Sequence, residues 1–166
     1  MKPLLAACCL LLAAAADVPA APSRVGEAEV RASPNGEPCF TISDHEERHF
    51  GTPNFDAVVV TDPQANRPVL WHMAMPHERT FPVAFTMCIP YGGRVQALPQ
   101  TPAAKLEPGK VYRVRIEARG ARGGVASAYE ARFCLARQHD GSVLVHHIGH
   151  DDHEGRRLYG CLPPGD

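Results

Sequence analysis

The chain has 166 residues, with 17 Lys and Arg against 18 Asp and Glu and a formal net charge of −1. This length suits a single domain, and the interspersed charges exclude the strong single-sign field that would attract nucleic acid or an anionic membrane surface. The sequence holds no P-loop, G-x-G-x-x-G or G-x-S-x-G motif, so we expect neither enzyme activity nor a cofactor.

The N-terminus is typical of an export signal. A short basic start precedes an unbroken apolar run over residues 4–16, which is too short to span a bilayer as a mature helix. We therefore expect a signal peptide over residues 1–20, a mature domain over residues 21–166 in the periplasm, and a flexible leader over residues 21–27. The stretch LAAC at residues 5–8 also resembles a lipobox, which leaves a lipid anchor at Cys8 as an alternative.

Beyond the leader, prolines and glycines divide the chain into short alternating runs, and no helix is expected. Early strands are predicted at residues 28–32, 39–42, 55–61, 69–75 and 81–88. Residues 110–120 and 127–136 alternate most clearly and predict a hairpin. Asp140-Gly141 then predicts a turn into a last strand at residues 143–148. About eight short strands without helical crossovers favour an antiparallel β-sandwich.

Four cysteines lie outside the apolar leader: Cys39, Cys88, Cys134 and Cys161. An even number in an exported chain predicts two disulfides, for which three connectivities exist. We predict Cys39–Cys88 and Cys134–Cys161, because the second bridge would tie the C-terminal segment to a strand of the sheet.

One local signature refines the fold. Residues 106–118, LEPGKVYRVRIEA, resemble the tyrosine corner of fibronectin type III domains, in which a tyrosine hydroxyl bonds back to the backbone. The resemblance implies an immunoglobulin-like sandwich with Tyr112 buried in that corner.

The densest group of metal-binding residue types is HHIGHDDHEG, residues 146–155. Side chains alternate along a strand, so His146 and His147 point to opposite faces and cannot bind one ion together. His150 and His153 follow in a glycine-bounded loop. We expect an exposed turn without a preformed metal site.

Two other stretches have alternative interpretations. Trp71, Met73, Met75 and His77 share one face of a predicted strand, which is typical of a core strand and also offers soft ligands for copper(I). Residues 41–49, TISDHEERH, offer groups for acid–base chemistry, and we interpret them as a charged surface loop.

Three stretches together resemble a known family: NGEPCFTI at residues 35–42, CIPYGG at residues 88–93 and GKVYRVRI…YEARFCL at residues 109–135. In this order they are similar to the periplasmic immunity lipoproteins of type VI secretion systems. The resemblance covers about residues 25–135 and implies a binding protein that occludes a toxin injected by a neighbouring cell. The alternatives are a copper-binding sandwich and a structural module of the envelope.

No contact residue carries over from that family. As toxin-binding candidates we select the charged and aromatic residues that flank the first predicted disulfide and are expected to be exposed: Asp44, Glu46, Glu47 and Tyr91.

Overall fold

The computed structural model describes residues 24–66, 68–93, 98–119, 124–149 and 161. The elements in chain order are β1 (Val25–Ala32), β2 (Pro38–Ile42), α1 (Asp44–Phe50), β3 (Asn54–Thr61), β4 (Val69–Ala74), β5 (Ile89–Pro90), β6 (Val111–Arg119), β7 (Ala128–Arg137) and β8 (Val143–Ile148). Within these residues no helix has the length and apolar character that crossing a membrane requires.

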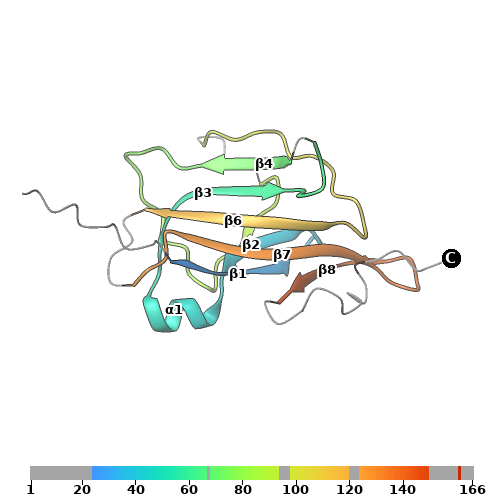
Figure 1. Ribbon diagram of the computed structural model, residues 1–166, viewed down its shortest axis with the longest axis horizontal. Coiled ribbons are helices and arrows are strands. Elements are labelled where there is room, and N and C mark those ends of the chain that lie inside the picture. Colours follow the sequence, from blue (N-terminus) through green and yellow to red (C-terminus); the bar gives the residue numbers. More distant parts are fainter. Residues whose placement is uncertain (1–23, 67, 94–97, 120–123, 150–160, 162–166) are drawn as a thin grey trace, which may run out of the picture.

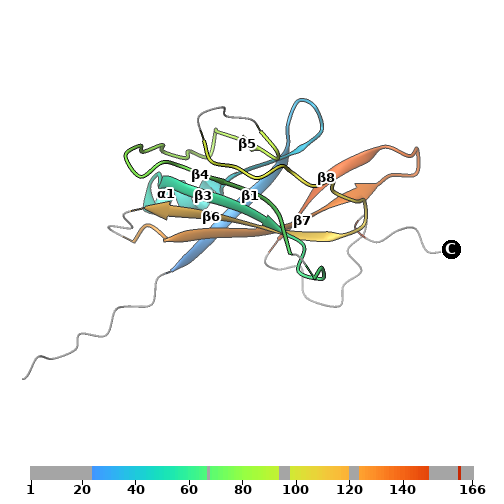
Figure 2. The same cartoon turned by 90° about the horizontal axis from the view of Figure 1, so that it is seen from above.

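The strands form one curled, mixed sheet with the order β4-β3-β6-β7-β1-β2-β5, and β8 also pairs with β7. The start of β1 pairs with β7 and the rest of β1 pairs with β2, so the sheet bends at β1 into a half-barrel. Figure 1 shows β4, β3, β6 and β7 side by side, and Figure 2 shows β5 lying above this layer.

One ladder corrects the expectation of a wholly antiparallel sheet, because β1 runs parallel to β7 from Val25 to Glu27. These residues also correct the predicted leader over residues 21–27, since its last three residues belong to a strand. Gly26 permits this approach: a Cβ there would lie 2.6 Å from Cδ1 of Tyr129. Alternation along a strand indicates which face is buried and carries no information about the partner at its edge.

The predicted hairpin and tyrosine corner are confirmed. Tyr112, Val114 and Ile116 of β6 are buried and Arg113 is exposed. The Tyr112 hydroxyl accepts a hydrogen bond from the Glu107 amide at 2.8 Å and donates one to the Glu107 carbonyl at 3.2 Å. Burial raises the pKa of Tyr112, so the hydroxyl keeps its proton as a donor.

Both predicted disulfides are confirmed. Cys39 and Cys88 are bridged with their Cα atoms 5.3 Å apart, and Cys134 and Cys161 with theirs 5.6 Å apart. The second bridge is buried in a small apolar cluster that also contains Ala136 and Ile148.

The predicted strand at residues 81–88 is wrong. This segment is irregular and makes one isolated bridge, between Pro82 and Asn54. The strand directly after it, β5, has only two residues. Prolines lack the amide proton that a ladder requires, and Pro82 and Pro90 fall within and just after this stretch.

The expectation of no helix is also wrong, because α1 occupies most of the stretch that we interpreted as a loop. Ser43 caps it, with the side-chain oxygen accepting from the Glu46 amide at 3.3 Å. Gly51 ends it with a φ of 83°, in the left-handed region that favours glycine. Ser43 followed three residues later by Glu46 is a known helix-start pattern.

Candidate functional site

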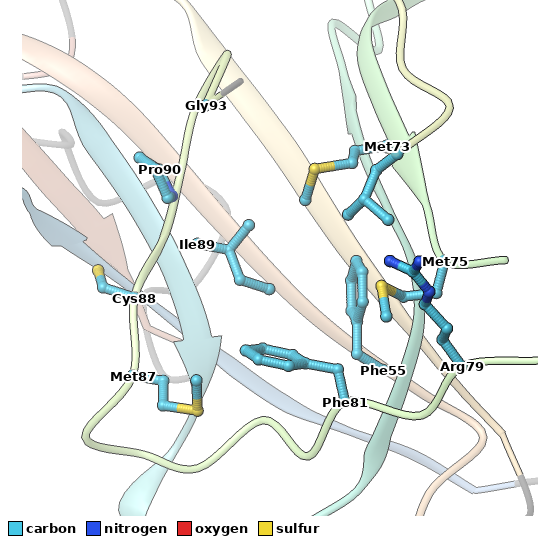
Figure 3. Close-up of a pocket in the computed structure, with 11 residues that line it drawn as sticks. Phe55, Met73, Met75, Arg79, Phe81, Met87, Cys88, Ile89, Pro90 and Gly93 are labelled. Carbon is cyan, nitrogen blue, oxygen red and sulfur yellow. The ribbon is translucent and has the colours of Figure 1, made fainter. Parts of the chain in front are cut away.

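A half-open pocket of about 330 Å³ lies between the inner face of β3 and β4 and the segment that contains β5. The described residues of its lining are apolar apart from one arginine: Phe55, Met73, Met75, Arg79, Phe81, Met87, Cys88, Ile89, Pro90, Gly93 and Leu98. Figure 3 shows the strand residues on one side, the residues around β5 on the other, and Arg79 beside Met75 and Phe55. Of the four methionines in the chain, all except Met1 line this pocket.

Arg119, at the end of β6, fixes one wall of the pocket, which is formed by β4 and the turn that follows it. Its guanidinium is paired with Asp56 of β3. It also donates hydrogen bonds to four carbonyls of the turn at residues 75–79: Met75 at 2.9 Å, Pro76 at 3.1 Å, His77 at 2.8 Å and Arg79 at 3.3 Å. One planar, permanently charged group therefore fixes the backbone of the whole turn.

The opposite wall is held by the Cys39–Cys88 bridge and by the pairing of β2 with β5. Thr41 donates to the Ala84 carbonyl at 2.8 Å, and a carboxylate oxygen of Glu47 accepts from the Phe85 amide at 3.2 Å. The loop that leads into β5 is thereby attached both to β2 and to α1.

The arrangement is suited to binding. Apolar side chains supply a desolvated surface, and the three methionine side chains can adapt to the shape of a ligand while the backbone of the walls stays fixed. Arg79 is exposed at the rim, and no ion pair joins it to a carboxylate of the described residues. It offers one positive charge to a ligand.

The structure does not bring the four selected toxin-binding residues together on one exposed surface. Glu46 is 4% exposed, so the exposure on which its selection depended is wrong. Asp44 is half-buried and paired with Arg48 on α1. Glu47 is half-buried and holds the pocket wall.

Tyr91 packs edge-on against Trp71 and donates to the Ala104 carbonyl at 2.6 Å. Burial raises the pKa of Tyr91 to about 12. These contacts make Tyr91 part of the scaffold behind the pocket.

Glu46 is paired with Arg24, whose two terminal nitrogens lie 2.7 and 2.6 Å from its carboxylate oxygens. The Arg24 hydrogen bonds hold the pKa of Glu46 below its ordinary value. Arg24 also lies over the ring of Phe50 at 3.9 Å. The start of β1 is therefore joined to α1 by charge and by ring contact.

This helix carries the sequence pattern H-E-x-x-H from His45 to His49, which the sequence analysis treated only as part of a charged stretch. In metal hydrolases the glutamate of this pattern acts on a metal-bound water. Here His45 and His49 are exposed and stacked with ring centroids 4.2 Å apart, whereas Glu46 is buried against Arg24. The three side chains do not converge.

The four residues of the possible copper(I) face do not share one environment in the structure. Trp71 and Met73 are buried in the core, Met75 is half-buried at the pocket, and His77 is exposed outside the pocket lining. The core interpretation is confirmed for Trp71 and Met73.

The opposite orientations of the first two tail histidines are confirmed. His146 is exposed, whereas Nδ1 of His147 accepts a hydrogen bond from the Val30 amide at 3.2 Å. His150 and His153 lie outside the described residues, so the expected exposed turn stays a prediction. Among the described residues no group of three His, Cys, Asp or Glu side chains is placed to hold a metal ion.

Comparison with known proteins finds no match. No family model, curated protein or solved structure matches this chain. The geometry of the pocket and the short motifs of the sequence are therefore the indications of function that this chain offers.

Most of the residues that make the pocket were not singled out from the sequence. Arg119 continues the run of polar residues at alternate positions of β6, and its partners are mostly backbone carbonyls, which leave no pattern in a sequence. Phe81, Arg79 and Met87 lie in the segments that join β4 to β5. The available signal was that the methionines outside the leader fall within residues 73–87, which the sequence analysis used only in part.

Proposed function

We propose that this chain is an exported binding protein that neutralises a secreted toxin, as the periplasmic immunity proteins of type VI secretion systems do. The observation that carries the proposal is that both walls of the apolar pocket are fixed, one by Arg119 and the other by the Cys39–Cys88 bridge. Segments that are ordered before association lose less conformational entropy on binding, so more of the contact free energy appears as affinity.

We assign the toxin contact to the pocket rim. Phe81 is a large apolar side chain that is 38% exposed, and Pro90 is exposed on the opposite side of the mouth. An exposed aromatic group on a fixed backbone is typical of the residues that dominate the affinity of protein interfaces.

Export through a signal peptide at residues 1–20 is part of the proposal, with a lipid anchor at Cys8 as the alternative. Two disulfides are compatible with it, because such bonds persist in oxidising compartments. We also propose that the curled sheet is an immunoglobulin-like sandwich in which β1 passes from one layer to the other. The tyrosine corner of Tyr112 supports this relation.

A growth assay tests the proposal. The chain is co-expressed with the product of the gene next to its own, which we expect to be toxic when it is directed to the periplasm. We expect the wild-type chain to restore growth, Phe81→Asp to lose protection, and Arg113→Gln on the outer face of β6 to keep it. Absence of protection by the wild-type chain contradicts the function, and full protection by Phe81→Asp contradicts the assigned surface.

The position of three methionines in one pocket favours a second candidate, copper(I) binding. Thioethers are ligands for copper(I), and the described cysteines are occupied in disulfides. A titration with copper(I) against a competing chelator tests this second candidate. A stoichiometric complex that is lost in the Met75→Leu/Met87→Leu double variant supports this candidate, and absence of such a complex excludes it.

A further inference from the structure

The interior of the pocket and its rim offer different chemistry. The rim exposes Phe81 and Pro90 to a partner, whereas the interior is a half-open apolar cavity at whose mouth the described residues place one cation, Arg79. A volume of about 330 Å³ falls within the range of small-molecule sites in proteins.

We propose that this pocket binds a small amphiphile that has a flexible apolar chain and a carboxylate, in its simplest form a free fatty acid. This inference goes beyond toxin binding, because it concerns the interior of the pocket and needs no protein partner.

The sign of the head group follows from Arg79. Its guanidinium lies beside Met75 and Phe55 at the mouth and is not paired with a carboxylate of the described residues (Figure 3). Arg119, a second described arginine of this region, is already bound to Asp56 and to the carbonyls of the turn. A ligand carboxylate can therefore pair with Arg79 without breaking an existing ion pair, and such charge-assisted bonds are the stronger ones.

The backbone of the pocket argues against a peptide as the occupant. Four amides along the two walls are already used: Phe55 donates to the Phe81 carbonyl at 2.7 Å, Met75 to Asp56 at 2.7 Å, Met87 to Ala84 at 2.9 Å and Gly93 to Pro90 at 3.0 Å. Peptide N–H and C=O groups inside this cavity would lose their water without gaining partners, and that desolvation is unfavourable. A hydrocarbon chain has no such groups.

The shape of the occupant follows from the lining. Methionine side chains are unbranched and adjust to irregular partners, and Met73, Met75 and Met87 surround the cavity together with two phenylalanines. A flexible unbranched chain gains dispersion contacts with such a wall in many conformations.

Dodecanoate below its micellar concentration is the probe, and dodecyltrimethylammonium is the control of equal chain length and opposite charge. Protein labelled with ¹³C at the methionine methyl groups reports the site, because Met73, Met75 and Met87 all line the pocket and Met1 does not. We expect saturable shifts of these three methyl signals with dodecanoate, and an affinity for dodecanoate at least about tenfold higher than for the cation.

Charge variants decide the role of Arg79. We expect Arg79→Gln to weaken dodecanoate binding about tenfold or more and Arg79→Glu to favour the cation, whereas Arg113→Gln leaves both affinities unchanged. Both arginines are exposed, so these variants keep the fold, and the dispersion of the methyl signals verifies it. Binding that leaves the pocket methyls unshifted, equal affinity for the two amphiphiles, or no effect of Arg79→Gln overturns the proposal. None of these outcomes bears on the toxin assay.

Discussion

Replacing Glu46 with Gln removes the charge from a carboxylate that is 4% exposed and has three donors. Arg24 supplies two of them, and the Glu27 amide supplies the third at 3.3 Å. The Gln side chain keeps one oxygen for these donors and places an NH₂ group against the guanidinium. The variant therefore breaks the contact that joins the start of β1 to α1 without changing the volume of the side chain.

The expected loss in free energy of unfolding is about 2–3 kcal/mol. Removing one partner of a fully buried ion pair lowers the free energy of unfolding by about 3–5 kcal/mol. The Arg24 side chain is 36% exposed and can regain water, which reduces the loss. In a domain of this size the melting temperature should fall by about 4–12 °C.

The difference in free energy of unfolding between wild type and variant should depend on pH. The folded-state pKa of Glu46 is lowered, chiefly by the Arg24 hydrogen bonds, from its ordinary value of 4.5. The stabilisation is thus fully present above the unfolded-state pKa and is lost as pH falls through the lower folded-state value. Wild type and Glu46→Gln should differ most at pH 6–7 and converge as pH falls well below 4.5.

Urea unfolding measures this difference. It can be followed by the fluorescence of Trp71, which is the single tryptophan and is fully buried. Glu29→Gln is the matched control, because the Glu29–Arg31 pair is about one-third exposed on both sides and should contribute less than about 1 kcal/mol. A change within about 0.5 kcal/mol in Glu46→Gln at pH 7, or a full-sized difference that persists in acid, refutes the reasoning.

Three further predictions test other contacts of the fold. Tyr112→Phe removes both bonds of the tyrosine corner and should destabilise the protein by about 1–3 kcal/mol in urea unfolding; no loss would mean that the corner hydroxyl contributes nothing net. The Cys39→Ser/Cys88→Ser double variant opens a loop of 49 residues and should lower the unfolding free energy by about 4 kcal/mol; a loss below about 1 kcal/mol would contradict this estimate. His147→Ala leaves a β1 amide without its acceptor and should cost about 1 kcal/mol, whereas exposed His146→Ala should change thermal stability little, and equal effects would contradict the strand alternation.

The sequence predicted the features that local alternation and the number and positions of the cysteines can specify. The runs in β6 and β7 showed which side chains face inward, and the Cys134–Cys161 pair followed from the need to attach the C-terminal segment. Tyr112 was predicted from a short motif because the corner is a local structure, closed by a bond across five residues.

The pocket could not be predicted in this way, because it depends on contacts between distant segments. Arg119 reaches carbonyls more than forty residues earlier in the chain, and backbone acceptors are the same for every residue type. The parallel ladder of β1 with β7 is equally non-local. In contrast, α1 was missed although Ser43 and Glu46 carried a start signal, because the charged composition of the stretch also suits a loop.

A calorimetric titration of the purified protein with the product of the gene next to its own, which we expect to be the toxin, tests the proposed binding function most directly. We predict a one-to-one complex that Phe81→Asp weakens at least about 30-fold, as expected for an anchoring aromatic residue, and that Arg113→Gln leaves unchanged. Absence of binding by the wild-type protein would contradict the account of function, and equal affinities of wild type and Phe81→Asp would contradict the assignment of the toxin contact to the pocket rim.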